Sequence, residues 1–146
     1  MPMTSRPLRV STGDPVVIDS SVAFKWFDPA EEGAAVAVDL LRAHGRDRVV
    51  LLAPAVLAPE VINALLCRGA GAESLERAVR FLDDVDLAIC PLDPALLIAA
   101  SRIALDERMA LYDAMFVALA VRFDAELVTA DRRQARTHAC RVRLIG

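Results

Sequence analysis

Short apolar runs and helix-length amphipathic stretches alternate along most of this chain. The predicted strands, each a short and largely apolar stretch, cover residues 16–19, 49–53, 87–90, 127–130 and 142–145. Apolar residues at helical spacing fill the intervals at 31–44, 59–68, 74–85, 94–107 and 112–123, and residues 132–139 predict a further short helix. Strands that alternate with helices favour right-handed crossovers and a parallel sheet between helical layers. We therefore predict an α/β fold.

Three local features describe these helices more closely. Glu31 and Glu32 supply acids to the first turn of the first long helix, where they favour the positive end of the helix dipole. Pro59 takes the first position of the helix at 59–68. The stretch 112–123 is apolar on nearly every face, so we expect this helix to be deeply buried.

Length and hydropathy limit the class of protein. The 146 residues suit one domain, which we place at 16–146, behind a flexible leader at 1–15 that is polar and aperiodic. Hydrophobic residues make up 55% of the chain, yet the longest uninterrupted apolar run, 114–121, is far shorter than the ~20 residues of a membrane helix. We therefore expect no membrane span and attribute the apolar excess to an interface with a second copy or another protein.

The cysteines and the charges carry less information. Cys67, Cys90 and Cys140 form neither a CxxC pair nor a disulfide framework, so we expect Cys67 and Cys90 to be core thiols and the compartment to be the cytoplasm. The formal net charge of −3 argues against strong affinity for nucleic acid over the whole surface. Arginines nevertheless crowd residues 132–143, either as phosphate contacts or as a solvated face.

Four acidic residues from distant parts of the chain fall at one edge of the predicted sheet. Asp19 and Asp131 each follow an apolar run, whereas Glu60 and Asp113 each lie at the start of a helix. In a parallel sheet, strands end and crossover helices begin at the same edge, where ligands bind. Clustered carboxylates repel one another unless a cation lies between them. The sequence therefore points to a site for Mg²⁺ or Mn²⁺ and to phosphate-ester chemistry.

Hydroxyl side chains accompany these acids. Ser20, Ser21 and Thr129 adjoin them in the sequence and can orient a carboxylate or a water. Each carboxylate also has a purely structural interpretation, as a helix cap or as a partner of a helix dipole. The conjunction of four acids favours the metal site, particularly at Asp113, because an unpaired charge beside a buried helix is costly.

Other chemistries find little support in the sequence. The chain has neither the GxxxxGK[ST] loop nor the GxGxxG pattern of nucleotide-binding proteins. His44 and His138 are too few and too remote from each other for a zinc site, and neither adjoins a strand end where a catalytic triad would need it. We expect both histidines at the surface.

A family resemblance rests on four segments around the acids: Val17-Ile18-Asp19-Ser20-Ser21-Val22-Ala23 with Lys25-Trp26-Phe27, Pro54 to Glu60 with Val61-Ile62-Asn63-Ala64-Leu65, Tyr112-Asp113-Ala114 with Ala118-Leu119-Ala120, and Leu127-Val128-Thr129-Ala130-Asp131. In this order and spacing they resemble PIN-domain ribonucleases, in particular the VapC toxins of bacterial toxin–antitoxin pairs. The likeness runs from about residue 16 to the end. The stretch before Asp19 is longer than is usual in that family.

The resemblance implies a three-layer α/β/α sandwich around a central, mostly parallel five-stranded sheet. It also implies Mg²⁺- or Mn²⁺-dependent endonucleolytic cleavage of RNA. By the family's pattern, Asp19 and Asp113 are the chief metal ligands, Glu60 and Asp131 complete the acidic pocket, and Thr129 supports it.

The same resemblance implies protein partners. Such toxins form homodimers, and a cognate VapB-type antitoxin wraps a groove near the first helices and blocks the pocket. Trp26 and Phe27 are either part of that groove or ordinary core aromatics.

Three alternative functions stay open at this point. A PIN-type nuclease in RNA processing would use the same residues. A phosphoacceptor signalling domain also gathers acids at the edge of a parallel sheet, but it depends on a lysine late in the chain, and the only lysine here is Lys25. A non-catalytic interaction module would carry these acids for structural reasons alone.

Overall fold

The computed structural model describes residues 12–146, and the strands within this range form one parallel sheet. Its five strands are β1 (Asp14–Ile18), β2 (Val49–Pro54), β3 (Ala88–Cys90), β4 (Glu126–Thr129) and β5 (Val142–Leu144). They lie in the order β3-β2-β1-β4-β5, and every neighbouring pair is parallel. The predicted parallel five-stranded sheet is confirmed.

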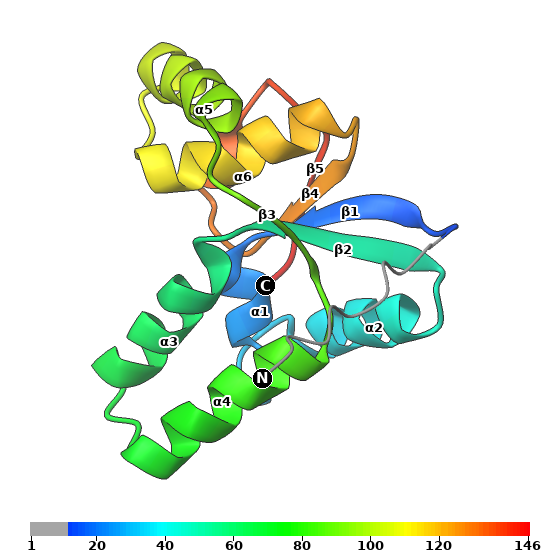
Figure 1. Ribbon diagram of the computed structural model, residues 1–146, viewed down its shortest axis with the longest axis vertical. Helices are drawn as coiled ribbons and strands as arrows, with labels where there is room; N and C mark the ends of the chain where they lie inside the picture. Colours follow the sequence, from blue (N-terminus) through cyan, green and yellow to red (C-terminus); the bar gives the residue numbers. More distant parts are fainter. Residues whose placement is uncertain (1–11) are drawn as a thin grey trace, which may run out of the picture.

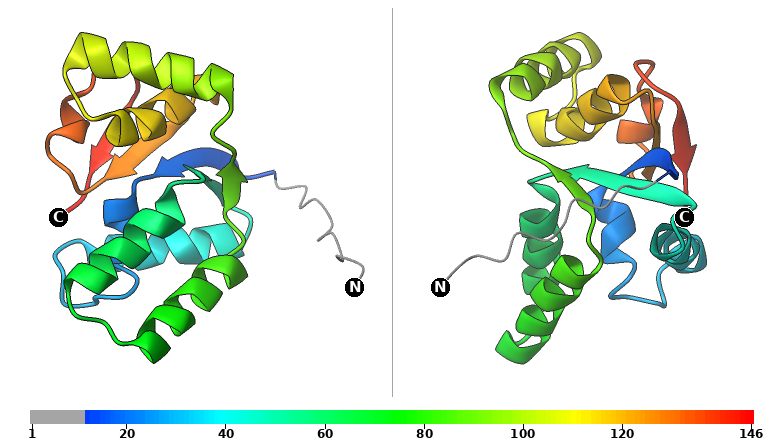
Figure 2. Two further views of the ribbon diagram at one scale, coloured as in Figure 1. Left: turned by 60° about the vertical axis from the view of Figure 1, so that its left-hand side comes forward. Right: turned by 45° about the vertical axis from the view of Figure 1, so that its right-hand side comes forward.

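Helices cover both faces of this sheet (Figures 1 and 2). On one face lie α5 (Pro94–Glu107) and α6 (Leu111–Arg122). The other face carries α1 (Ser20–Phe24), α2 (Ala34–Gly45), α3 (Leu57–Cys67) and α4 (Ala72–Asp84), and a 3₁₀ turn, η1 (Gln134–Arg136), connects β4 to β5. The molecule is therefore the predicted three-layer α/β/α sandwich.

The core occupies both faces of the central strands. Val17 of β1 pairs with Leu52 of β2 on one side and with Leu127 of β4 on the other. Strands that are buried on both faces have continuous apolar sequences, as these do. In α6, every residue from Ala114 to Ala120 is buried, which confirms the burial predicted for this helix.

The order of the strands determines where a ligand can bind. The chain adds β2 and then β3 on one side of β1, and it returns through α5 and α6 to place β4 on the other side. Where the connections from two neighbouring strands lead to opposite sides, a crevice forms outside the carboxyl ends of those strands. This crevice is where α/β proteins bind ligands. Here that crevice lies beyond β1 and β4, directly before Asp19 and Asp131.

Two helix starts differ from the prediction. The first long helix begins at Ala34, because its N-cap Gly33 has a left-handed φ of 81° that a regular helix cannot continue. Glu31 therefore precedes the helix and accepts a hydrogen bond from Lys25 Nζ at 2.9 Å. The next helix begins at Leu57, so that Pro59 is its third residue, still within the turn whose backbone N–H groups need no partner in the helix.

Residues 132–139 form only the short turn η1, not the predicted helix. The carboxylate of Asp131 accepts a hydrogen bond from the backbone N–H of Arg133 at 2.8 Å and so starts the turn. Thr137 ends it with an extended ψ of 141°.

Several buried and exposed positions also correct the prediction. His44 is buried and not at the surface: its Nε2 lies 3.1 Å from the carbonyl oxygens of both Val85 and Asp86, and its Nδ1 accepts a hydrogen bond from the Leu51 N–H. Cys67 is exposed and not a core thiol, because it ends α3 beyond the part of that helix that contacts the core.

The predicted leader at 1–15 falls largely on residues 1–11, which lie outside the described residues. Its last part belongs to the sheet, since Asp14 and Pro15 open β1 and pair with Val49 and Val50 of β2. Between residues 12 and 146, no helix has the length and apolar character needed to span a membrane.

Candidate active site

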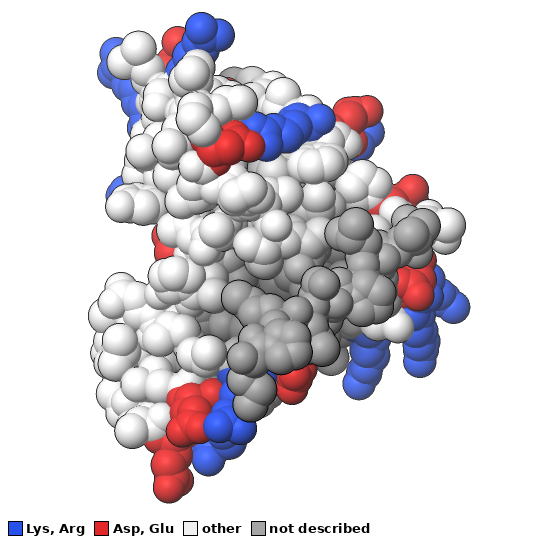
Figure 3. Space-filling view, in the orientation of Figure 1, with Lys and Arg blue, Asp and Glu red and all other residues white. Residues whose placement is uncertain are grey.

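The four predicted acids lie at the carboxyl edge of the sheet, around the crevice between β1 and β4. Asp19 is the N-cap of α1 directly after β1, and Asp131 lies two residues after β4. Glu60 and Asp113 occupy the first turns of α3 and α6. Figure 3 shows a hollow on the left of the molecule, between the helices above and below the sheet, with acidic side-chain atoms visible inside it.

Electrostatics shows that these carboxylates lie within range of one another. Burial, together with the negative charges of Asp19, Asp131 and Glu60, raises the pKa of Asp113 to about 6. Burial also raises the pKa of Glu60; a hydrogen bond from Ser20 opposes this rise, and the charge of Asp19 adds to it. The topology and the electrostatics thus place all four carboxylates around one crevice.

Asp19 is the most enclosed of the four, with 6% of its surface exposed. Its Oδ2 accepts a hydrogen bond from the Ser21 backbone N–H at 3.0 Å, so Asp19 caps α1, as its structural interpretation also predicted. Its Oδ1 accepts a second hydrogen bond, at 3.2 Å, from the side-chain amide of Gln134. These contacts fix the orientation of the carboxylate before any ligand binds.

The three hydroxyl residues have different roles. Ser20 donates a hydrogen bond to Glu60 Oε1 at 2.6 Å and so orients a carboxylate, as the sequence indicated. Ser21 Oγ instead accepts a hydrogen bond from the Ala130 backbone N–H at 3.0 Å, and Thr129 Oγ1 accepts one from the Asp131 N–H at 3.0 Å. Ser21 and Thr129 therefore hold the backbone after β4 that carries the fourth acid.

Gln134 is a site residue that the sequence analysis missed. It is 1% exposed, and its Nε2 donates both to Asp19 Oδ1 and, at 3.1 Å, to the backbone carbonyl of Asp113. Because both partners can only accept, the orientation of the amide is unambiguous. Its Oε1 is buried without a hydrogen-bond partner among the described residues. Gln134 thus links the end of β1 to the start of α6.

The donor set is suitable for a hard divalent cation. All four side chains offer carboxylate oxygens, which Mg²⁺ and Mn²⁺ prefer, and Mg²⁺ is usually held by one or two carboxylates with waters completing its shell. Within residues 12–146, no three acidic, histidine or cysteine side chains lie close enough together to enclose an ion by themselves. The arrangement therefore fits a hydrated ion held by two carboxylates better than a protein cage.

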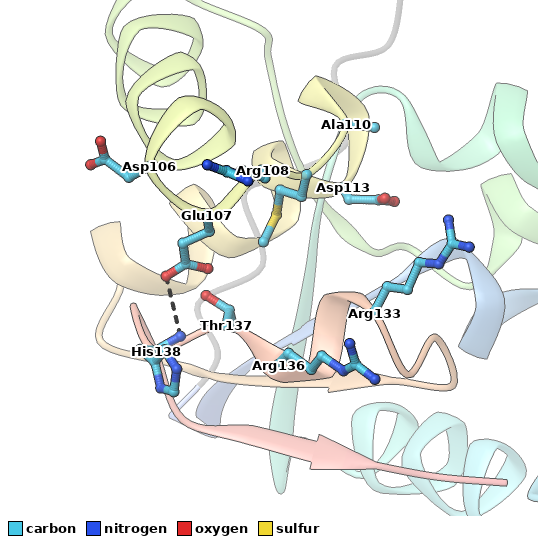
Figure 4. A pocket seen from close by; sticks show the side chains of 10 residues that line it. Asp106, Glu107, Arg108, Ala110, Asp113, Arg133, Arg136, Thr137 and His138 are labelled. Carbon is cyan, nitrogen blue, oxygen red and sulfur yellow. Dashed lines mark hydrogen bonds between the residues drawn. The ribbon is translucent and has the colours of Figure 1, made fainter.

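Two cavities flank the acids. One, of about 600 Å³, includes Asp113 in its wall and extends between the end of α5 and η1 (Figure 4). The other, of about 450 Å³, lies between α1 and α3 and includes Ser20 and Glu60. A chain-like substrate that crosses the carboxylates can enter a cavity on either side.

A charged network that the sequence did not reveal lines the second cavity. Lys25 is buried, and its Nζ pairs with Glu31 Oε2 at 2.9 Å. Arg68 pairs with Glu31 Oε1 at 2.8 Å and with Asp28 Oδ2 at 2.9 Å, and its guanidinium lies 4.7 Å from the centre of the Phe24 ring. The hydrogen bond from Lys25 holds the pKa of Glu31 below its ordinary value. The network joins α1, α3 and the loop before α2.

Solved structures share this fold at low sequence identity. The chain is similar to VapBC2 from Rickettsia felis, solved with a DNA fragment from the promoter, with a TM-score of 0.69 and 9% identity over 90% of this chain and 99% of that one. It is similar to PAE2754 from Pyrobaculum aerophilum (TM-score 0.63, 21% identity, 92% of this chain and 88% of that one). A third is VapC20 from Mycobacterium tuberculosis, a Sarcin-Ricin loop cleaving toxin (TM-score 0.64, 15% identity, 82% and 92%).

Sequence comparison determines the family. No curated protein is a detectable sequence relative of this chain. The family model described as the PIN domain, however, matches residues 16–139, a span that runs from β1 through η1 and contains all four acids. The chain therefore belongs to the PIN domain family.

Proposed function

We propose that this protein is a Mg²⁺- or Mn²⁺-dependent endoribonuclease that acts as the toxin of a toxin–antitoxin pair. The observation that carries the proposal is the gathering of four carboxylates at the ligand-binding edge of the sheet, where burial and their mutual repulsion raise the pKa of Asp113 to about 6. Membership of the PIN domain family supports the nuclease chemistry. A cation that neutralises this cluster is the simplest reason for such an arrangement.

Each acid has a distinct role in this proposal. Asp19 and Asp113 hold the ion, and Glu60 and Asp131 complete the acidic pocket. When bound, the ion polarises the phosphodiester and lowers the pKa of a coordinated water. Gln134 donates to Asp19 Oδ1 and to the Asp113 carbonyl, so it fixes the two ligand-bearing segments relative to each other.

Glu60 has the properties of a group that accepts a proton during the reaction. Ser20 occupies its Oε1, which leaves Oε2 to take the proton of an attacking water. Its raised pKa brings it closer to the working pH, as general base catalysis requires.

RNA as the substrate and the role of toxin draw support from the structural neighbours. VapC20 is described as a Sarcin-Ricin loop cleaving toxin, and VapBC-5 as a member of the VapBC family of toxin–antitoxin systems. FitAB was solved with the IR36 DNA fragment. We carry these roles to the present chain as part of the proposal.

The surface offers a groove suited to a VapB-type antitoxin. A groove of about 670 Å³ between α4 and the segment that follows α1 is lined by Trp26, Phe27 and Phe81, with Arg80 and Asp84 in its wall. Phe81 packs edge-on against Phe27 at 5.4 Å and against Trp26 at 6.2 Å between ring centres. Trp26 and Phe27 pack against the core with one side and line the groove with the other, so both interpretations of these aromatics apply. Their exposed parts suit the apolar side chains of a peptide.

A homodimer in the cytoplasm completes the proposal. Large apolar side chains on and after α5 and α6 stay exposed in the single chain, among them Leu105 at 81%, Tyr112 at 56% and Ile98 at 55%. Pairing of this face with a second copy would remove them from water. The phosphoacceptor alternative loses support, because its one possible lysine, Lys25, is paired with Glu31.

The test is an RNA cleavage assay with purified protein in Mn²⁺, in Mg²⁺ and in excess EDTA. We expect cleavage only with a divalent ion, and we expect Asp19→Asn and Asp113→Asn each to lower the rate by at least about a hundredfold. Asp39→Asn, an exposed carboxylate on α2, is the matched control and should cleave like wild type. Cleavage that persists in EDTA, or full activity in either variant, would contradict the proposal.

A further inference from the structure

The cavity beside Asp113 has room for a part of a ligand that does not contact the four carboxylates. It measures about 600 Å³, within the roughly 300–1,000 Å³ typical of small-molecule sites. The loop between α5 and α6 forms one wall, and the segment around η1 forms the other (Figure 4). Because Asp113 belongs both to this cavity and to the acidic crevice, a ligand bound at the acids can continue into it.

Two arginines share the η1 wall. Arg133 is the N-cap of η1 and Arg136 its last residue, so they lie three positions apart in a turn where such side chains fall on the same side. Figure 4 shows both side chains extending from this segment in the same general direction as the side chain of Asp113. The intervening Gln134 points inward to Asp19, and the neighbouring Arg132 does not line the cavity.

Neither arginine has an anionic partner within the described part of the chain. Arg68, Arg122 and Arg143 each pair with a carboxylate, whereas Arg133 and Arg136 form no ion pair with any residue from 12 to 146. The Asp131 carboxylate beside them instead accepts hydrogen bonds from backbone N–H groups. Two unpaired guanidinium groups thus face a cavity directly beside a carboxylate cluster.

The acids of this cavity, Asp106, Glu107 and Asp113, all lie on the wall formed by α5, α6 and their connecting loop, opposite the wall that carries the two arginines. Glu107 Oε1 accepts a hydrogen bond from the His138 N–H at 3.2 Å (Figure 4), and Glu107 Oε2 is buried without a hydrogen-bond partner among the described residues. Asp106 is exposed at the end of α5. Asp113 belongs to the acidic cluster, where the proposed cation would offset its charge. The η1 wall therefore offers positive charge and hydrogen-bond donors to an anion.

We infer that Arg133 and Arg136 form a subsite for the backbone phosphates of single-stranded RNA, next to the phosphodiester that is cut. The inference rests on the proposed function and adds the substrate contact that the acids cannot provide. Carboxylates repel RNA, and the whole chain has a net charge of −3, so affinity must come from a local cationic surface. Planar guanidinium groups bind phosphate oxygens through paired hydrogen bonds.

The experiment measures RNA binding apart from cleavage. A fluorescein-labelled single-stranded RNA of mixed sequence is titrated with full-length protein in EDTA, over a series of salt concentrations. We expect the double variant Arg133→Gln/Arg136→Gln to bind this RNA more weakly, with a Kd raised roughly tenfold for each arginine replaced. We also expect the slope of log affinity against log salt to become shallower by about 1.4, since each contact with a single strand contributes about 0.7.

Arg132→Gln is the matched control, because it removes one charge from the same exposed segment without touching the cavity. It should change Kd less than about threefold. With Mn²⁺ present, the double variant should raise KM while kcat stays within about threefold of wild type. Circular dichroism confirms that each variant is folded.

Three results would overturn the inference. If wild type cuts RNA but the double variant binds RNA as tightly as Arg132→Gln does, the subsite is wrong and the proposed nuclease survives. If kcat falls as strongly as kcat/KM, the arginines act in the chemical step and not as a binding subsite. If wild type neither binds nor cuts RNA, the proposed function fails and the subsite fails with it.

Discussion

Asp113→Asn should stabilise the metal-free protein at neutral pH, although it removes a residue of the proposed active site. The pKa of Asp113 is raised from 3.8 to about 6 in the folded protein. A carboxylate whose pKa is raised on folding imposes no cost below its unfolded pKa, where both states are protonated. Between pH 4 and 6 the folded state binds more protons than the unfolded state, so stability falls as the pH rises. Above pH 6 the full cost is present.

The size of this cost follows from the shift. About two pKa units correspond to roughly 3 kcal/mol, and because Asp113 is only half-buried, solvent screening reduces the expected gain to about 1–2 kcal/mol. The favourable contact of the carboxylate with the amino end of α6 opposes the effect by about 0.3–1 kcal/mol at most. The raised pKa of Asp113 indicates that burial and repulsion outweigh this contact. Asparagine keeps the shape and removes the charge.

Urea denaturation in EDTA at pH 7.5 and at pH 4 measures the effect. The variant should gain about 1–2 kcal/mol over wild type at pH 7.5 and almost nothing at pH 4. Asp39→Asn, on the exposed face of α2, should change stability by less than about 0.5 kcal/mol at either pH. A destabilised Asp113→Asn protein at pH 7.5, or an equal gain at both values of pH, would refute the electrostatic reasoning.

Three further predictions follow from buried contacts. In steady-state kinetics with Mn²⁺, Gln134→Leu should lower kcat by about 10–100-fold with little change in KM, because Asp19 loses a hydrogen bond that orients it. Gln134→Glu should lower kcat further than Gln134→Leu does, because it places a second negative charge beside Asp19. Lys25→Met should lower the free energy of unfolding, measured by urea denaturation, by about 1–3 kcal/mol, since Glu31 then keeps only its more exposed partner Arg68. Adding Glu31→Gln should recover part of this stability. His44→Phe should lower the free energy of unfolding by about 2–4 kcal/mol in the same urea experiment, because it leaves backbone groups on β2 and after α4 without their hydrogen-bond partner. A variant as stable as wild type would show that water replaces the ring.

The sequence predicted the parts of the fold that depend on hydrophobic pattern. Apolar runs that match a buried strand, as at Val17 and Leu127, alternate with helical spacing, and this alternation is enough to specify a parallel sheet between helices. The edge on which Asp19 and Asp131 meet follows from the direction of the strands alone. The location of the acids was therefore accessible before any coordinates.

The missed features are polar side chains whose burial depends on tertiary contacts. Gln134 lies in an arginine-rich segment with no apolar periodicity, and only the approach of Asp19 and the Asp113 carbonyl gives it partners. His44 is buried because the segment after α4 supplies two carbonyl oxygens from about 40 residues away. Lys25 likewise depends on Glu31, which lies outside the helix because Gly33 is left-handed. Spacing along a chain carries no record of such encounters.

The most direct test of the central claim is a crystal structure of the protein soaked in Mn²⁺, with the ion located by its anomalous scattering. We expect one peak within coordination distance of carboxylate oxygens of both Asp19 and Asp113, with Glu60 and Asp131 around it. A structure in which manganese avoids that crevice, or in which those carboxylates point into separate regions, would contradict it.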